Sequence, residues 1–582
     1  MAGITRRDFL RASAWALGGV VVSTGLQGCL SSSSSSDPEV ERSLAFEHGV
    51  ASGDPLSDRI MVWTRVTPKD SSTADVDISW EVASDAAFTQ MLHSGSARTG
   101  QARDFTLKVD VQNLTPGQSY YYRFKAGSAT SPAGRMKTLP AAGVTQVRFA
   151  VLSCSNFPAG YFHAYAQAAQ ESELDAVLHL GDYIYEYATG EYATEDAAAL
   201  GRSLPADNNG ELFTLDDYRK RYALYRTDAD LQALHAAAPF IAVWDDHEVA
   251  NDTWTDGAEN HNDGEGDFNQ RKLAALQAYF EWLPVRPASE NDELTIYRSF
   301  DFGDLVSLHM LDTRIIGRDE QLSYANYISA GGLDAARFIA DVGATDRTLL
   351  GQPQMNWLQS QLAVSSARWQ VLGQQVLMGR MLLPAEMLTA LADPANADLA
   401  TTLGELVPLK LRVQAGDPTL TPQEIARIET VIPYNLDAWD GYAYEREVIF
   451  GLARALDKNL VVLAGDTHNA WANNLKTLAG EPVGVEFATA GVTSPGLESY
   501  LGLPAAAIPQ AEQAITLLVD ELQYLNASQR GYLVVTFTED QARADWRFVS
   551  TVKARDYVID DARSKALITL PGKVNRVINP AT

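Results

Sequence analysis

The chain has 582 residues, 46% of them hydrophobic, and a formal net charge of -28. This length allows roughly two to four domains with packed cores. An acidic surface repels nucleic-acid backbones and anionic lipid headgroups, so we expect no nucleic-acid partner beyond one used as a substrate. A substrate that carries phosphate would need positive charge concentrated at its site, and metal ions held by acidic side chains are the obvious source. We expect a monomer.

The first 36 residues are predicted to be an export signal and a tether, outside the fold. Arg6 and Arg7 precede the apolar stretch 14–22, which is too short to span a bilayer and is typical of a signal for the twin-arginine export machinery. The sequence Leu26-Gln27-Gly28-Cys29 resembles a lipobox, and the serine run 31–36 would follow it as a flexible tether. Two alternatives stay open, a periplasmic or cell-surface lipoprotein anchored through Cys29 and a soluble exported protein cut near Gly28.

Cysteine usage draws attention to one thiol. The chain has two cysteines, and if Cys29 is lost to cleavage or lipid, Cys154 is the only thiol in the folded part and has no disulfide partner there. A buried cysteine at a strand end can serve as a small hydrophobic residue. It can equally be a thiolate that coordination to a metal protects from oxidation. Both interpretations of Cys154 stay open on these grounds.

Residues 45–140 are predicted to form a small all-β domain of fibronectin- or immunoglobulin-like type. Its expected strands are short, rich in β-branched and aromatic residues, mostly alternating, and separated by turn residues. They cover residues 60–66, 76–82, 105–111 and 120–126. Because this region contains no cluster of metal-ligand residues, we expect a scaffold or lid beside the catalytic domain, with a boundary near 140–143.

From residue 147 the pattern changes to strands that alternate with helical segments, which predicts an α/β catalytic domain over residues 145–550. Four short apolar runs in it each end in a polar cluster. This pattern is typical of buried strands whose carboxyl ends carry the chemistry of an open sheet. The runs are 147–152, 176–180, 240–243 and 460–464.

The polar clusters contain the ligand types of a two-metal site. Asp182 and Tyr185 are three residues apart, so a loop or helical turn can direct both to one side. Asp466 and His468 alternate, which turns both to one face of an extended segment. Two metal ions about 3.5–4 Å apart can clamp a phosphoryl group and ionise a bridging water, so no serine nucleophile is needed. The central cluster adds five donors: Asp245, Asp246, His247, Asn251 and Asp252.

Positive charge near these clusters has two interpretations. Arg271 lies on the expected helix 269–281 after the central cluster, and its planar fork could steady a phosphate oxygen. The basic residues of 218–226 fit better as a solvated helix face paired with acids. For any single residue of the polar clusters an N-cap or core role is the commoner one. Their recurrence after four apolar runs is what indicates a site.

These clusters resemble the motifs of the PhoD-type alkaline phosphatase/phosphodiesterase family, within the calcineurin-like metallophosphatases. The resemblance extends over about residues 46–548 and includes the N-terminal β domain. It implies a four-layer αββα sandwich preceded by the small all-β domain. The residues that carry it are 153–156, 180–186, 244–252 and 464–469, with further likeness at 351–378, including Gln354, and at 437–442.

The resemblance also implies a mixed centre of Fe3+ and Ca2+. Calcium would be bound by Asp182, Asp466 and either Asn251 or Asp252, because the family's asparagine ligand has two candidates here. His247 would lie near the leaving group or hold the ligands in place, with Asp246 beside it as a further catalytic residue. A tyrosinate ligand to iron implies a visible charge-transfer band. Iron would be bound by Cys154, Asp182, Tyr185 and His468.

The expected activity is hydrolysis of phosphomonoesters, phosphodiesters or both by attack of a metal-bound hydroxide, favoured at alkaline pH. Alternatives are a phospholipase D-like or teichoic-polymer phosphodiesterase and, in another class, a surface-anchored binding module on an inactive hydrolase fold. A helical insertion at 383–435, with a helix that begins at Pro422, is expected to shape the rim of the cleft. Residues 551–582 are expected to form a C-terminal extension that partly gates the site.

Overall fold

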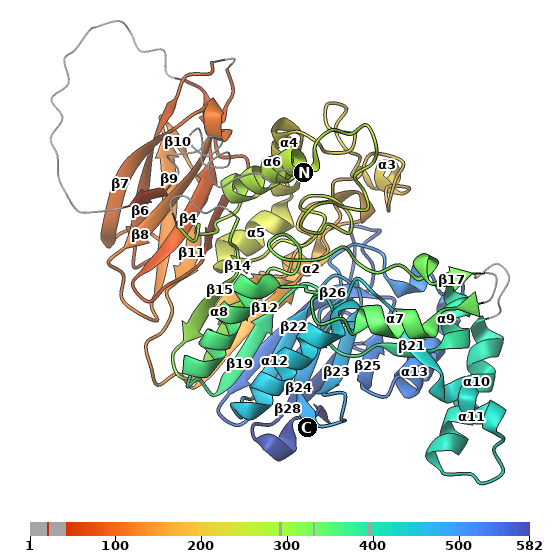
Figure 1. Ribbon diagram of the computed structural model, residues 1–582. Helices are drawn as coiled ribbons and strands as arrows, with labels where there is room; N and C mark the ends of the chain where they lie inside the picture. Colours follow the sequence, from red (N-terminus) through yellow and green to blue (C-terminus); the bar gives the residue numbers. More distant parts are fainter. Residues whose placement is uncertain are drawn as a thin grey trace, which may run out of the picture.

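Figure 1 shows the computed structural model, which describes residues 20–22, 42–70, 72–289, 294–329, 332–392 and 399–581. The arginine pair, Cys29 and the serine run of the predicted export signal lie outside the described residues. Val20–Val22 (β1), from the apolar stretch of that signal, pairs in parallel with Thr106–Gln112 (β8). Among the described residues, no helix has the length and apolar character needed to cross a membrane.

The catalytic part is built on two large sheets. In the first, three parallel strands are followed by antiparallel ones, in the order β14 (Phe240–Ala242), β13 (Ala176–His179), β12 (Gln146–Leu152), β26 (Arg530–Thr538) and β27 (Ala542–Val549). The second has the order β15 (Arg298–Phe302), β16 (Val306–Met310), β19 (Trp369–Gly373), β22 (Leu460–Ala464), β24 (Pro482–Ala488), β23 (Ala470–Lys476) and β25 (Leu522–Asn526). The four predicted apolar runs are β12, β13, β14 and β22.

The two sheets share one hydrophobic core. Phe149 of β12 meets Phe302 of β15 edge to face, with 4.9 Å between ring centroids, and Phe487 of β24 meets Trp546 of β27 at 5.7 Å. Such aromatic pairs bury large apolar areas in defined geometry. Helices cover the outer faces, with α2 (His163–Ala168) against β26 and β27 and α12 (Ala443–Ala455) against β24. These layers form an αββα sandwich, so the predicted fold class is confirmed.

The N-terminal region is all-β, with strands where the sequence predicts them. They include β4 (Arg59–Arg65), β6 (Val76–Ala83), β8 and β9 (Ser119–Ala126). One of its sheets is continuous with the first catalytic sheet, because β3 (Val50–Gly53) pairs in parallel with β14. The pair is Gly53 and Phe240, and a Cβ on Gly53 would lie 2.6 Å from the Phe240 carbonyl oxygen. Glycine therefore permits the close approach of the two regions at this point.

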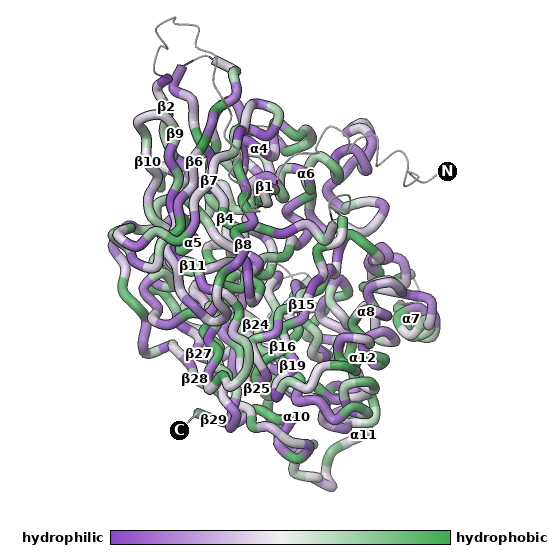
Figure 2. The backbone as a smooth tube through the Cα atoms, turned by 90° about the vertical axis from the view of Figure 1, so that its left-hand side faces the viewer, coloured by the Kyte–Doolittle hydropathy of each residue, from purple (hydrophilic) through white to green (hydrophobic). Residues whose placement is uncertain are grey.

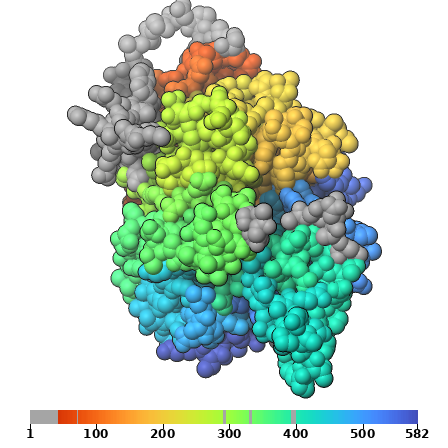
Figure 3. All heavy atoms as spheres, turned by 45° about the vertical axis from the view of Figure 1, so that its right-hand side comes forward, coloured from red at the N-terminus to blue at the C-terminus, as the bar shows by residue number. Residues whose placement is uncertain are grey.

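The predicted insertion is helical and lies at the opposite end of the molecule from β6, β7 (Met91–Thr99), β9 and β10 (Ala129–Thr130) (Figure 2). Its last helix begins at Pro422 as predicted, and Thr421 and Glu424 form a reciprocal capping box at its start. Figure 3 shows this region protruding from the body of the molecule. Between β20 (Leu382–Pro384) and β21 (Val431–Pro433) the insertion contains α9 (Ala385–Ala392), α10 (Leu399–Gln414) and α11 (Pro422–Glu429).

The C-terminal extension has two parts. Strands β28 (Lys565–Thr569) and β29 (Asn579–Pro580) extend the edge of the first sheet beside β27. Residues 551–557 run along α2 instead, where the backbone N–H of Tyr161 donates to the Val552 carbonyl oxygen at 2.8 Å. Tyr557 stacks on His163 there, with 3.8 Å between ring centroids. Partial gating of the site by residues 551–582 stays a prediction.

Candidate metal centre

The fold brings the four polar clusters together from both sheets. The clusters after β12, β13 and β14 lie at the carboxyl edge of the first sheet, and the cluster after β22 reaches them from the second. Three groups of side chains each place their ligand atoms within 4.8 Å of one another. Asp182 and Asp246 each belong to two groups, so the groups are contiguous. They are Cys154, Asp182 and His468, then Asp182, Asp246 and His247, then Asp245, Asp246 and Asp466.

The loops that carry these side chains have an unusual backbone conformation. Gly181 has φ +103°, and a Cβ there would lie 2.3 Å from the Cβ of Asp245. A Cβ on Gly465 would lie 2.8 Å from the Ser153 hydroxyl, so this glycine serves close packing. Left-handed non-glycine residues are uncommon and tend to cluster at functional sites. Here they include Cys154, Asp182, Asp252, Asp466 and His468, with φ between 51° and 62°.

Cys154, Asp182, Tyr185 and His468 form the first candidate cation position. The Tyr185 hydroxyl donates to Asp182 Oδ2 at 2.9 Å and lies 3.2 Å from His468 Nε2. Asp182 Oδ1 is buried and has no hydrogen-bond partner among the described residues. A buried carboxylate oxygen without a partner is costly unless a cation or water meets it. This oxygen therefore fits a metal ligand.

His468 is held in the tautomer that a metal ligand requires. Its Nδ1 lies 2.6 Å from the Pro495 carbonyl oxygen, which only accepts hydrogen bonds, so Nδ1 carries the proton. The lone pair of the neutral ring is then on Nε2, which faces Tyr185 and Asp182. The Tyr192 hydroxyl also lies 3.2 Å from Nδ1, on the other side of the ring from Tyr185. Partners of this kind orient metal-binding histidines.

Electrostatics at this position favour a bound cation. Burial and the neighbouring Asp182 raise the pKa of the Cys154 thiol and of the Tyr185 hydroxyl well above their ordinary values. Both groups are therefore protonated in the absence of a cation and become thiolate and phenolate ligands only when one is bound. A thiolate, a phenolate, an imidazole and a carboxylate form a donor set that suits a transition metal better than calcium or magnesium. These residues fit the iron that the family resemblance implies.

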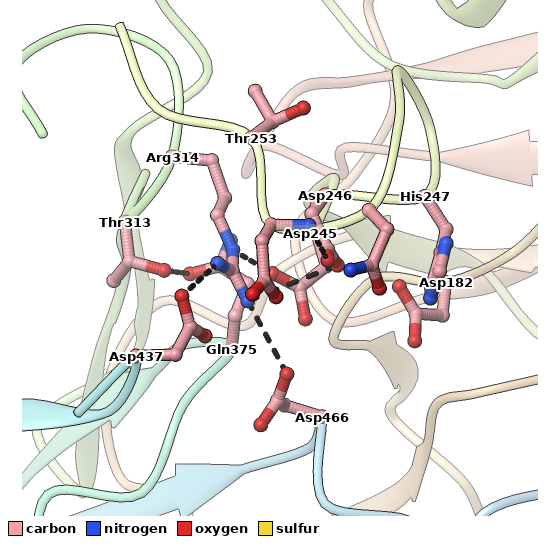
Figure 4. A network of polar contacts seen from close by, with 12 residues as sticks. Asp182, Asp245, Asp246, His247, Thr253, Thr313, Arg314, Gln375, Asp437 and Asp466 are labelled. Carbon is pink, nitrogen blue, oxygen red and sulfur yellow. Dashed lines mark hydrogen bonds and ion pairs between the residues drawn. The ribbon is translucent and has the colours of Figure 1, made fainter. Parts of the chain in front are cut away.

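Asp245, Asp246 and Asp466 form the second candidate cation position, and a buried arginine lies against them (Figure 4). Arg314 Nε donates to Asp245 Oδ1 at 2.5 Å and Nη2 donates to Asp466 Oδ1 at 3.2 Å. Asp245 Oδ2 is buried without a hydrogen-bond partner among the described residues. Several carboxylate oxygens at one place are typical of a calcium site. The donor set therefore fits calcium.

The two predicted alternatives for a further ligand, Asn251 and Asp252, lie at the edge of this position. The Asn251 side-chain amide donates to Glu259 at 2.6 Å. The backbone N–H of Asp252 donates to Asp246 Oδ2 at 2.6 Å, while burial, Asp437 and Asp246 raise the pKa of its carboxyl to about 8. Asp252 belongs to none of the three ligand groups. Ligation by either residue stays a prediction.

The imidazole of His247 is fixed by Glu186. His247 Nδ1 donates to Glu186 Oε2 at 2.7 Å, since a carboxylate only accepts. Glu186 Oε1 accepts from the backbone N–H of Asn251 at 2.7 Å and from the Asn260 amide at 3.0 Å. The His247 ring packs beside that of Tyr185, with 4.2 Å between centroids. His247 therefore presents Nε2 within the group that contains Asp182 and Asp246.

Arg271 does not join the ligand groups. Its Nε, Nη1 and Nη2 donate to the Tyr218 hydroxyl at 3.2 Å, the Asn260 carbonyl oxygen at 2.8 Å and Glu211 at 2.8 Å. The side chain is buried. Asn260 in turn donates to Glu186, which orients His247. The geometry thus places Arg271 behind the site, and the predicted contact with a phosphate oxygen stays a prediction.

The sequence interpretation missed Arg314 and the contact of Asp437 with it, although it included Asp245 and Asp466, the other two carboxylates that Arg314 contacts. Arg314 follows the mostly apolar stretch 305–311, which includes Ser307 and His309 and most of which is β16, so it occupies a fifth strand end that leads into polar residues. That repetition is the signal that could have found it. Glu186 and Glu248 lie in the motifs 180–186 and 244–252, but the sequence alone indicates no role for them.

The comparisons with known proteins agree with this geometry. A family model described as "PhoD-like phosphatase" matches residues 149–546, and its N-terminal domain model matches residues 31–140. The chain belongs to the PhoD-like phosphatase family. Alkaline phosphatase D of Bacillus subtilis (strain 168) is 35% identical over 525 residues, which cover 88% of this chain and 78% of that protein. A solved structure titled "Structure of PhoD" matches with a TM-score of 0.73 and 31% identity, over 94% of both chains.

Membership of the PhoD-like phosphatase family confirms the resemblance predicted from the four motifs. The chain is a phosphoric ester hydrolase, and the clusters at its strand ends are candidate ligands for the metals on which such an enzyme depends. The likeness covers both the N-terminal β region and the αββα sandwich.

Proposed function

We propose that the chain is an exported metallohydrolase that releases phosphate from phosphomonoesters, phosphodiesters or both at alkaline pH. The observation that carries this proposal is the convergence of Cys154, Asp182, Tyr185 and His468 around a buried carboxylate oxygen that lacks a partner among the described residues. An inactive binding module on the same fold would have no need of this donor set. The proposal therefore favours the enzyme over the binding module.

The proposed cofactors are Fe3+ and Ca2+. Cys154, Asp182, Tyr185 and His468 would hold the iron. When bound, the pair of metals supplies Lewis acidity and lowers the pKa of a coordinated water. Asp182, Asp466 and either Asn251 or Asp252 would hold the calcium, and Asp245 and Asp246 lie beside them as further oxygen donors.

His247 is the proposed proton donor to the leaving alcohol. Although burial opposes it, the carboxylates of Asp246 and Glu186 raise the pKa of His247 well above its ordinary value. Glu186 holds the Nδ1 proton, so Nε2 is the atom that exchanges a proton with substrate. Asp246 supports this role through its charge beside the ring. Arg271 acts through Asn260 and Glu186 to keep the ring in place.

We propose that substrate enters the site from the side of Asp466 and His468. Their side chains are 17% and 16% exposed, whereas Cys154 and Asp182 are buried. A polar cavity of about 380 Å³ lies next to His468, since both Pro495 and Arg530 line it. Residues 551–553 form part of its wall, and Lys553 pairs with Asp196 at 2.8 Å. We propose residues 551–557 as the partial gate of the site.

The proposed location of the protein is outside the cytoplasm. Arg6 and Arg7 would direct export through the twin-arginine machinery, and Cys29 would carry a lipid if the lipobox is cut. The mature protein would then be periplasmic or at the cell surface, and monomeric.

Hydrolysis of p-nitrophenyl phosphate and of bis-p-nitrophenyl phosphate tests the proposed activity. The wild-type protein should cleave at least one of them faster at pH 9 than at pH 7, and chelation should abolish the activity. Asp182→Asn, which removes a charge from the first cation position, should be inactive. Activity that survives both chelation and Asp182→Asn would overturn the proposal. The ratio of the two rates decides between monoesterase and diesterase.

A further inference from the structure

Arg314 contacts carboxylates from three other parts of the chain (Figure 4). Its three nitrogens reach Asp245 Oδ1 after β14, Asp466 Oδ1 after β22 and Asp437 Oδ1 after β21, the last at 2.8 Å. Each contact uses only one oxygen of the carboxylate. The second oxygen of Asp245 is buried and has no hydrogen-bond partner among the described residues. The arginine thus determines which carboxylate oxygens face the second cation position.

Arg314 is too deeply buried to reach a substrate. Its side chain has 0% exposure, and Nε, Nη1 and Nη2 are all occupied by carboxylates. Asp246 lies 3.7 Å from Nη2, so four carboxylates surround one guanidinium. Removal of a buried charge from such a network leaves the remaining charges uncompensated. The contribution of Arg314 to the site is therefore made through its neighbours.

A framework of buried amides holds the loop that carries Arg314. Asp312 Oδ1 accepts from the backbone N–H of Arg314 at 2.9 Å, and the Asp312 backbone exchanges two hydrogen bonds with the Gln354 amide, at 2.8 and 2.7 Å. Thr313 donates to Gln375 Oε1 at 2.6 Å, and the Gln375 amide donates to the Trp244 carbonyl oxygen at 2.6 Å. The motif 351–378, which had no assigned role, thus joins the Arg314 loop to the central cluster.

We infer that Arg314 is a positioning residue that sets the geometry of the carboxylates at the second cation position and, through Asp437, ties them to the end of the 383–435 insertion. The inference rests on the proposed function, in which Asp466 binds a calcium ion and Asp245 and Asp246 lie beside it as further oxygen donors. A lysine at this position keeps the charge but loses the planar fork that meets three carboxylates at once. Arg314→Lys therefore tests how much the geometry of the guanidinium contributes, because the net charge stays constant.

Calcium titrations of the full chain test the inference, with thermal stabilisation and phosphoester hydrolysis as the two readouts. We expect Arg314→Lys to raise the calcium concentration at half-effect about 10- to 100-fold in both, as substitutions of residues that orient metal ligands do. Saturating calcium should restore most of kcat. The matched control is Arg446→Lys, because Arg446 is also buried and its ion pair in the part of the chain that the structure describes is with Asp440, which belongs to none of the three ligand groups. We expect this control to lower thermal stability without changing the calcium concentration at half-effect, which we call the calcium midpoint.

Equal calcium midpoints for Arg314→Lys and the wild-type protein would overturn the inference, and so would an equal shift in both arginine variants. If Arg314→Lys does not fold, Asp437→Asn provides the test, because it removes one of the carboxylates that hold the guanidinium. It should raise the calcium midpoint less than Arg314→Lys would, and an unchanged midpoint would contradict the inference. A wild-type protein that calcium neither stabilises nor activates would instead overturn the proposed calcium site itself.

Discussion

The Glu248 carboxylate accepts the backbone N–H of Asp182 at 3.0 Å. It also accepts the backbone N–H groups of Tyr183 at 2.6 Å and Asp245 at 2.7 Å. One buried side chain thus joins the loop after β13 to the loop after β14. The backbone around both sets of candidate ligands depends on this carboxylate, although it belongs to none of the three ligand groups.

Glu248→Gln should damage the centre without removing a ligand. A glutamine has one acceptor oxygen, so at least one of the three backbone donors would meet an amide N–H instead of an oxygen. A buried backbone donor left without a hydrogen-bond partner costs about 1–3 kcal/mol. We expect a lower melting temperature in differential scanning calorimetry together with less bound metal. A variant with wild-type metal content would show that the loops hold their positions without Glu248.

The two tyrosines beside His468 should differ in their effects. Tyr185→Phe removes the proposed phenolate ligand, so bound iron and its visible band should both be lost. Tyr192→Phe is the matched control, because His468 Nδ1 still donates to the Pro495 carbonyl oxygen and stays oriented. It should keep the band and most of the activity. A band that persists in Tyr185→Phe would exclude Tyr185 as its source.

His247→Asn should lower kcat far more than it changes KM. We expect kcat to fall about 10²- to 10⁴-fold for a substrate whose alcohol is a poor leaving group, as for other general acids. The loss should be smaller for a nitrophenyl ester, whose leaving group needs little protonation. Glu186→Gln should have a weaker effect, since the amide oxygen can still accept from His247 Nδ1. Equal losses for both substrates would argue against proton donation by His247.

The thermal stability of the chain should depend on pH through His48, which lies at the contact between the N-terminal region and Trp282. Burial and the neighbouring Arg65 and Arg226 lower the pKa of His48 to about 3. In the unfolded chain the His48 imidazole takes up a proton below about pH 6.5, whereas in the folded chain it stays neutral until about pH 3. The free energy of unfolding therefore falls as the pH decreases from 6.5 towards 3. The fall in melting temperature between pH 6.5 and 5 should be smaller in His48→Gln. An identical fall would contradict this account.

The strand ends were predictable because their signal is local. In β12, β13, β14 and β22 a short apolar run is followed directly by the polar residues that it positions. The parallel pairing of β12, β13 and β14 then places three clusters at one edge, as expected for such a sheet. The helix start at Pro422 is equally local, since the Thr421 and Glu424 capping box lies within four residues.

The partners of Arg314 were not predictable by such local patterns. Its carboxylate contacts are separated from it by 69, 123 and 152 residues along the chain. Only the packing of the two sheets and the return of the chain after the insertion bring Asp245, Asp437 and Asp466 to one guanidinium. The continuity of the N-terminal sheet with β14, made at Gly53 and Phe240, depends on tertiary packing in the same way.

Metal analysis of protein purified without added metal, combined with its visible spectrum, tests the central claim most directly. We predict bound iron with a tyrosinate charge-transfer band and calcium in the same preparation. Removal of calcium by a selective chelator should abolish phosphoester hydrolysis, and its return should restore it. A colourless protein that contains neither metal and stays inactive after both are supplied would contradict the account.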